Sequence, residues 1–115
     1  MYVTNLAKVE KTVMKMEGAE KVHKQIPLSQ AVGVPNFSFR VFTVEPGGHT
    51  PFHQHPAEHM NYIIEGQGVV VTKDREIEIK KGDFALVLPG EMHQYKNTSK
   101  TQNLQLICAV PKQYE

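Results

Sequence analysis

The sequence predicts an all-β fold, a barrel or sandwich built from short strands. Aromatic and β-branched residues, which favour a pleated sheet surface, dominate several runs, of which Phe37–Val44 is the clearest. Glycine and proline interrupt these runs about every 8–12 residues, a spacing typical of β-sandwiches and β-barrels. No segment shows the period of an amphipathic helix. With 115 residues and no stretch that looks like a linker, the chain is expected to form one domain, residues 1–115.

The strand pattern is weak before Phe37 and firm after it. Residues 2–36 contain only loose alternation of polar and apolar residues. The segment Pro46-Gly47-Gly48 is expected to end the first firm strand. Phe84–Leu88 is apolar throughout, which predicts a strand buried on both faces. The expected strands are Phe37–Val44, His59–Glu65, Val69–Lys73, Glu76–Lys80, Phe84–Leu88, Glu91–Lys96 and Leu104–Val110.

Composition and charge exclude several classes of protein. The formal net charge is +1 and basic residues alternate with acidic ones, so no nucleic-acid partner is expected. The longest apolar runs have five residues, whereas a membrane helix needs roughly 18 or more, so no membrane partner is expected. The first residues lack the apolar segment of a secretory signal, and the single cysteine, Cys108, has no disulfide partner in the chain. These features favour a cytoplasmic location.

Histidines form the most informative cluster in the sequence. Five of the six lie between His49 and His93. In an extended chain His53 and His55 point the same way, about 6–7 Å apart, which suits two ligands of one metal ion. His59 shares their parity, although Pro56 interrupts the pattern, and His93 follows the turn at Pro89-Gly90. The spacing predicts a metal site made of four residues, which are His53, His55, His59 and His93.

These histidines occur in two blocks with defined internal spacing. The first block, residues 46–66, reads Pro46-Gly47, five residues, His53-x-His55, three residues, His59, six residues and Gly66. The second block, residues 82–97, reads Gly82, five residues, Leu88-Pro89-Gly90, two residues, His93, three residues and Asn97. The two blocks resemble the two signature motifs of the cupin superfamily. The resemblance implies a double-stranded β-helix, or jelly-roll barrel, and a homodimer.

Two positions depart from the cupin motifs. Leu88 stands at the usual proline position, and proline follows it as Pro89. His59 stands where the family usually has glutamate. The neighbouring Glu58 is an alternative ligand, but the six residues that separate His59 from Gly66 favour His59. A fourth imidazole in place of a carboxylate leaves the full charge of the metal on the site, so open positions should attract anionic or oxygen ligands.

The four-histidine pattern resembles that of certain small single-domain bacterial and archaeal cupins. The resemblance implies one divalent transition metal per chain, with Mn or Fe favoured, while imidazole ligands also suit Zn, Ni and Cu. Three functions then compete. The first is a metal-dependent oxidoreductase, similar to a dioxygenase, that acts on a small organic substrate. The second is a non-redox metalloenzyme, an isomerase or lyase, that acts on a small oxygenated metabolite. The third is a small-molecule binding protein without turnover.

Residues near the two blocks are candidates for a substrate pocket. Tyr95 shares parity with His93, but ordinary barrel packing explains it equally well. Cys108 is expected on the core face, either as a small buried hydrophobe or as a thiol near the metal. Arg40 either meets an anionic substrate or extends to solvent, and the second is favoured. His23 and His49 are expected in solvent, and Asn97 at a turn. The candidate pocket residues are Phe39, Phe52, Ile63, Tyr95 and Cys108, with Phe37 beside them.

Overall fold

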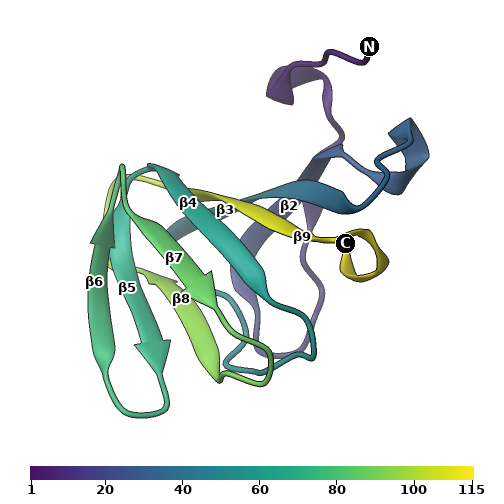
Figure 1. Ribbon diagram of the computed structural model, residues 1–115. Helices are drawn as coiled ribbons and strands as arrows, with labels where there is room; N and C mark the ends of the chain where they lie inside the picture. The colour runs from purple at the N-terminus through teal and green to yellow at the C-terminus, as the bar shows by residue number, and fades with distance from the viewer.

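The computed structural model, which describes residues 1–115, contains a nine-stranded antiparallel sheet and three short 3-10 turns (Figure 1). The predicted all-β class is therefore confirmed. None of the turns, Leu6–Lys8, Gln30–Val32 and Lys112–Tyr114, has the length or apolar character of a membrane-crossing helix. The strands are β1 (Thr12–Val13), β2 (Glu20–Leu28), β3 (Phe37–His49), β4 (His59–Glu65), β5 (Gln67–Thr72), β6 (Glu76–Lys80), β7 (Phe84–Val87), β8 (His93–Asn97) and β9 (Leu104–Pro111).

The sheet is organised around the long strand β3 and curls into a barrel-like shape. The strand order is β6-β5-β8-β3-β9-β4-β7, while β2 pairs with β3 and the short β1 pairs with β2. Most of β3 pairs with β9, from Phe37 opposite Pro111 to Val44 opposite Leu104. The end of β3 pairs instead with β8, where His49 lies opposite Lys96. One strand thus joins the two parts of the sheet (Figure 1).

The expectation that Pro46-Gly47-Gly48 ends this strand is wrong, because β3 continues through it to His49. Gly48 allows this continuation. A Cβ atom at Gly48 would lie 2.6 Å from the carbonyl oxygen of Glu20, so only glycine lets β3 and β2 approach this closely. The extension carries the following residues onto β8, where the Thr50 amide donates to the Tyr95 carbonyl at 2.9 Å.

The core lies inside the curl and follows the alternation of the strands. In β9 every second side chain, from Leu104 to Val110, is buried. Ile63 of β4 and Val44 of β3 are also fully buried against this row. Burying one such aliphatic side chain stabilises a fold by about 1.5–3 kcal/mol, so this row contributes much of the free energy that closes the sheet.

The prediction that Phe84–Leu88 is buried on both faces is wrong. Strand β7 is an edge strand that pairs only with β4, and the side chains of Phe84 and Leu86 are 80% and 57% exposed. Val87 is buried because it points to the inner face. A continuous apolar run indicates two covered faces, but nothing within this chain covers the outer face of β7.

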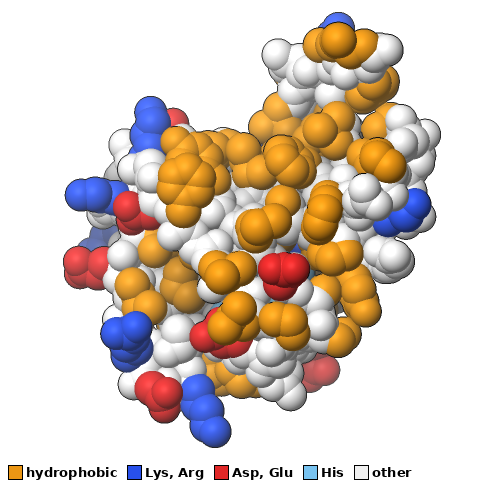
Figure 2. Space-filling model, viewed as in Figure 1, with side chains coloured by type: hydrophobic (Ala, Val, Ile, Leu, Met, Phe, Trp, Pro, Cys, Tyr) orange, Lys and Arg blue, Asp and Glu red, His pale blue; other side chains and the backbone are white.

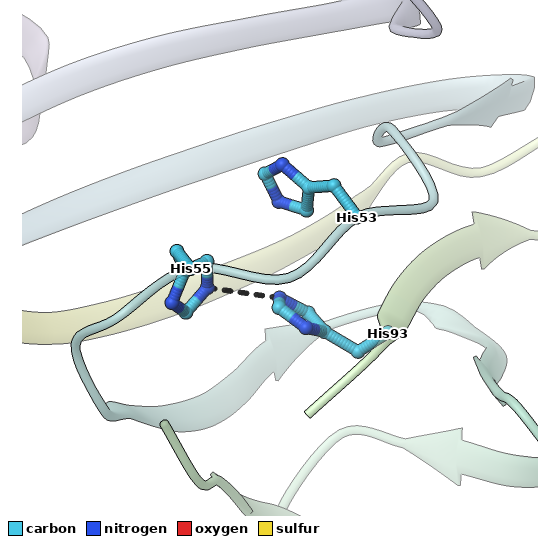
Figure 3. A group of neighbouring side chains, drawn as sticks. All are labelled: His53, His55 and His93. Atoms are coloured by element: carbon cyan, nitrogen blue, oxygen red, sulfur yellow. Dashed lines mark hydrogen bonds between the residues drawn. The ribbon is translucent and has the colours of Figure 1, made fainter. Parts of the chain in front are cut away.

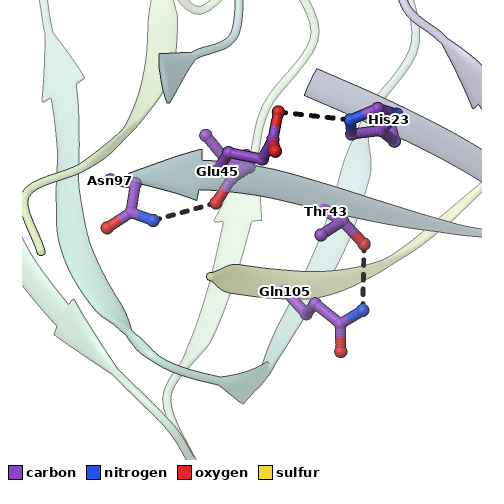
Figure 4. Close-up of polar contacts among 6 residues, drawn as sticks. His23, Thr43, Glu45, Asn97 and Gln105 are labelled. Atoms are coloured by element: carbon purple, nitrogen blue, oxygen red, sulfur yellow. Dashed lines mark hydrogen bonds and ion pairs between the residues drawn. The ribbon is translucent and has the colours of Figure 1, made fainter. Parts of the chain in front are cut away.

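Polar side chains pin the ends of the strands (Figure 4). Asn97, expected at a turn, donates its amide hydrogens to the carbonyls of Val44 at 2.9 Å and Gln102 at 2.8 Å. Its oxygen accepts from the amide of Ser99 at 2.9 Å. Asn97 therefore fixes the loop between β8 and β9 against β3. Figure 4 also shows the ion pair that His23 forms with Glu45 at 3.3 Å.

Candidate metal centre

The four predicted histidines come together from three segments of the barrel. His53 and His55 lie on the connection from β3 to β4, His59 begins β4, and His93 begins β8. The backbones of His53 and His93 form an isolated antiparallel bridge, with N–H···O distances of 3.2 and 3.0 Å. This bridge carries the connection across the mouth of the barrel. It therefore sets the two imidazoles side by side, 5.2 Å between ring centroids.

Three of these side chains present their nitrogens to one point (Figure 3). One ring nitrogen from each of His53, His55 and His93 lies within 4.8 Å of the others. The Nε2 atoms of His55 and His93 are 3.2 Å apart. The separation of these two atoms is suitable for imidazole nitrogens that share one metal ion.

The backbone sets the tautomers of two of these rings. Nδ1 of His55 lies 2.6 Å from the carbonyl of Ala57, and Nδ1 of His93 lies 2.8 Å from the carbonyl of Glu91. A nitrogen that faces a carbonyl carries the proton, so each facing Nε2 presents a lone pair. Two lone pairs 3.2 Å apart repel each other unless a cation lies between them. The histidines present therefore fit a transition metal, and the carbonyls orient them.

His59 occupies a different position from the other three. Its ring stacks on that of His55, with centroids 3.7 Å apart and planes 22° apart. It is not among the three histidines whose donor atoms converge. Both of its ring nitrogens face Arg40, whose Nη2 lies 3.3 and 3.4 Å from them. Glu58, the alternative ligand, is exposed on the surface and does not line the cavity.

Burial keeps these imidazoles neutral. It is the main cause that lowers the pKa values of His53, His59 and His93. For His59 burial and then the charge of Arg40 lower the pKa to about 3. The carbonyl of Glu91 partly opposes the shift at His93. Because only the neutral ring binds a metal, the site is ready to bind one at neutral pH.

The histidines lie at one end of a cavity of about 250 Å³. No Asp or Glu lines it. Its wall combines apolar side chains with two cations and a few neutral polar groups. The apolar part comprises Met14, Met16, Phe42, Pro51 and Leu106; the cations are Lys24 and Arg40; the polar part comprises Thr50, Asn61, Tyr95, Cys108 and Tyr114.

Of the predicted pocket residues, Tyr95 and Cys108 line this cavity and three others do not. Phe39 and Phe52 are 42% and 45% exposed, and Phe37 is similarly exposed. In β3 the even-numbered residues point inward, so Phe37 and Phe39 point outward. Ile63 is fully buried in the core and does not reach the cavity.

Several cavity residues come from the two ends of the chain, and the sequence did not predict them. Met14, Met16 and Lys24 lie in the region where no strand pattern was firm, and Tyr114 follows the last strand. Nothing in the local sequence marks them, because the first three reach the cavity through the pairing of β1 with β2 and of β2 with β3, and Tyr114 through the pairing of β9 with β3. Phe42 lies in the predicted strand Phe37–Val44, but on the opposite face from Phe37 and Phe39.

Tyr95 is a neutral hydrogen-bond donor inside the cavity. Its hydroxyl donates to Oδ1 of Asn61 at 2.8 Å. Burial raises the pKa of Tyr95 far above its usual range, so the phenol keeps its proton. Tyr95 and Asn61 therefore make this part of the cavity polar without adding a charge.

The expectation that Arg40 extends to solvent is wrong, because its side chain is only 7% exposed and lines the cavity. Nη2 donates to Sγ of Cys108 at 3.0 Å. The guanidinium carbon lies 4.9 Å from the centre of the Phe42 ring, close enough for a cation–π contact. A cation thus stands beside the histidine cluster.

Comparison with known proteins supports a family assignment. Residues 40–110 match the family model Cupin_2, described as a cupin domain. A protein of Methanocaldococcus jannaschii is 32% identical over 59% of this chain and 55% of its own length. The oxalate-binding protein of Thermotoga maritima is 33% identical over 55% of this chain and 53% of its own length. The matched regions thus span about half of each relative.

Solved structures with the same architecture cover nearly the whole chain. The polyketide cyclase RemF of Streptomyces resistomycificus aligns with a TM-score of 0.91 and 25% identity, covering 97% of this chain and 80% of that one. A predicted oxalate decarboxylase of Thermotoga maritima aligns with a TM-score of 0.83 and 24% identity, covering 96% of this chain and 98% of that one. At this identity the second likeness concerns the fold alone.

Proposed function

This chain belongs to the cupin family, and we propose that it is a metal-dependent enzyme that acts on a small organic molecule through oxygen donors of that molecule. One divalent transition metal ion per chain would be held by His53, His55, His59 and His93. The observation that carries the proposal is the pair of Nε2 atoms of His55 and His93, 3.2 Å apart with both lone pairs facing inward.

The identity of the metal is part of the proposal. Mn or Fe is our first choice, and Zn, Ni and Cu also suit imidazole ligands. When bound, the ion would polarise an oxygen donor of the substrate, and Mn or Fe would add redox chemistry toward dioxygen. His59 would join the other three by turning its ring away from the stack with His55, which leaves Arg40 free of its present contact.

An oxidoreductase of the dioxygenase type is the first candidate reaction. The cavity offers no carboxylate to serve as general base, and the buried phenol of Tyr95 keeps its proton. Such a lining does not suit reactions that need a positioned protein base, whereas oxidation by dioxygen does not require a protein base. The apolar wall, with Met14, Phe42 and Leu106, suits a hydrophobic portion of the substrate.

A non-redox reaction is the second candidate, and one comparison favours it. The structure of RemF, which is described as a polyketide cyclase, aligns with 97% of this chain. Polyketides carry carbonyl oxygens that a divalent ion can polarise. Oxalate, which the relative from Thermotoga maritima is named for binding, carries such oxygens too. A cyclisation or isomerisation at the same centre would then proceed without dioxygen.

Metal content measured by plasma mass spectrometry on untagged protein tests the proposal, together with an electron paramagnetic resonance spectrum. We expect about one divalent transition metal per chain. Mn, Fe or Cu would justify a screen for oxygen consumption with aromatic and alkene substrates, while tightly held Zn would favour the non-redox candidate. No metal after reconstitution with each of these ions would contradict the proposal.

The expected homodimer and the cytoplasmic location are also proposals. Figure 2 shows hydrophobic side chains gathered on the face that carries β4 and β7. They include Met60, Phe84, Leu86 and Leu88, all exposed in the single chain. A second copy would remove this surface from water. Light scattering coupled to size-exclusion chromatography, with Phe84→Asp as the disrupting variant, measures the oligomeric state directly.

A further inference from the structure

Arg40 is a buried cation without an anionic partner. Its side chain is 7% exposed and forms no ion pair, since the only ion pair in the chain joins His23 to Glu45. Its Nε atom is buried and has no hydrogen-bond partner. Burying an unpaired charge is unfavourable, and proteins usually satisfy such groups with a counter-ion or a ligand.

The contacts that Arg40 does make are weak for a guanidinium. They are a thiol sulfur of Cys108 at 3.0 Å and the carbonyl of Tyr114 at 3.4 Å. Nη2 also lies 3.3 and 3.4 Å from the two ring nitrogens of His59, but a neutral imidazole offers only one of them as an acceptor. None of these acceptors is a carboxylate. The planar guanidinium group of Arg40, whose paired N–H groups bind carboxylates well, therefore has no carboxylate partner.

The charge of Arg40 acts on the same cavity as the histidines. Lys24 also lines this cavity, and no carboxylate does. Burial and then the charge of Arg40 lower the pKa of Lys24, and the charge of Glu115 raises it by less. The carboxylate of Glu115 already accepts from the hydroxyl of Ser38 and from the amide of Gln30 at 3.1 Å. The cavity thus combines two cations with neutral imidazoles, and a bound metal ion would add further positive charge.

We infer that Arg40 binds a carboxylate group of the substrate beside the metal centre, so that the substrate is a small organic acid. One of its oxygens would reach the metal, and the carboxylate would pair with the guanidinium group of Arg40. This inference rests on the proposed function and adds the charge of the substrate to it. The competing explanation is structural, with Arg40 serving only to hold Tyr114 and Cys108 in place.

Glycolate and its uncharged analogue glycolamide separate the two explanations. Both present a hydroxyl and a carbonyl oxygen, but only glycolate carries a carboxylate. Isothermal titration of each into metal-loaded protein compares the wild-type chain with Arg40→Gln and Arg40→Lys. Arg75→Gln is the matched control, because Arg75 is the only other arginine and lies exposed in the turn between β5 and β6. Metal content and thermal stability are measured first on every variant.

We expect Arg40→Gln to weaken glycolate binding at least about tenfold and to leave the metal content unchanged. This is the effect expected when a charged, hydrogen-bonded pair is lost. Arg40→Lys should retain part of the affinity, and Arg75→Gln all of it. Glycolamide should bind more weakly than glycolate to the wild-type chain and should not respond to Arg40→Gln. Equal glycolate affinity in wild type and Arg40→Gln would overturn the inference and leave the metal centre intact.

Two further results keep the test decisive. If Arg40→Gln does not fold, Arg40→Lys decides: reduced glycolate affinity in that variant supports the inference, and affinity equal to that of the wild-type chain would reject it. If no metal binds, the proposed function fails by its own measurement. Glycolate is then titrated into the metal-free chain, where binding that is lost in Arg40→Gln supports the inference and absence of binding refutes it.

Discussion

The hydroxyl of Tyr95 on β8 donates a 2.8 Å hydrogen bond to Oδ1 of Asn61 on β4. The two strands are not neighbours in the sheet, so this bond crosses the interior of the curl. Both residues are buried and both line the cavity. The bond therefore connects the strand that begins with His93 to the strand that begins with His59.

Removing this bond should destabilise the protein. Tyr95→Phe leaves Oδ1 of Asn61 buried without its partner, which costs about 1–3 kcal/mol of unfolding free energy. Urea denaturation of the metal-free chain measures the loss. Tyr62→Phe is the control, because Tyr62 is partly exposed and packs its ring on Phe84 without a side-chain hydrogen bond. A similar effect of the two variants would show that the buried bond contributes nothing particular.

His55→Ala should weaken metal binding by about 100-fold or more, because it removes a nitrogen that faces the centre. The far-ultraviolet circular dichroism should change little, since His55 lies outside the named strands. His23→Ala provides the comparison, as His23 contacts Glu45 on the surface and not the cluster. Competition with a fluorescent zinc chelator reports both affinities. Unchanged affinity in His55→Ala would remove this residue from the site.

His59→Glu should retain metal binding and shift metal preference toward Mn. A carboxylate adds an oxygen ligand and a negative charge, which favour Mn relative to Cu, and we expect the ratio of the two affinities to change by about tenfold. The carboxylate would also lie beside Arg40, now 3.3 Å from Nε2 of His59. Competition between the two ions, read by plasma mass spectrometry after dialysis, measures the ratio. If the ratio stays the same, His59 is not a ligand or its charge does not govern preference.

Acid should destabilise the metal-free chain. Burial and the charge of Arg40 lower the pKa of His59 from 6.5 to about 3. Between these pKa values the unfolded chain binds the proton and the folded chain does not, so stability is full above pH 6.5 and falls as the pH drops. Between pH 7 and pH 5 we expect a loss of about 1 kcal/mol from this group, after discounting for partial exposure.

Thermal denaturation at pH 7, 6 and 5 measures this loss, which corresponds to a decrease in Tm of about 4 °C or more. The variant His59→Asn, which does not titrate, should show a smaller decrease over the same range. An equal decrease in both chains would assign the pH dependence to other groups.

Gly66 should tolerate substitution less well than Gly82. Both have positive φ, +84° and +97°, which disfavours any other residue. A Cβ atom at Gly66 would also collide with the backbone of Asn103 and Leu104, whereas nothing lies within 4 Å of one at Gly82. We expect Gly82→Ala to cost about 1–2 kcal/mol and Gly66→Ala at least about 2 kcal/mol more, measured by urea denaturation. Equal costs would mean that the chain relaxes around Gly66.

The sequence predicted the architecture well where one strand face is apolar and turns are marked by glycine or proline. Strands β4, β6 and β9 begin at the predicted residues and end within one residue of the predicted limits. In β4, Met60 and Tyr62 point outward while Asn61 and Ile63 are buried, as the alternation of a strand requires. Prediction failed at β7, because five apolar residues in a row do not reveal whether a neighbouring layer exists.

The sequence alone determined the family, the fold class and the set of histidines near the centre. Spacing within a strand is a local property, so it indicates by itself that His53 and His55 point the same way, while the resemblance of the two blocks to the cupin motifs added His59 and His93. The pairing of β2 with β3 and the curl of the sheet decided what surrounds them. Only these long-range contacts bring Met14, Lys24 and Tyr114 to the cavity and bury Arg40 without a counter-ion, because burial depends on neighbours that are distant in the chain.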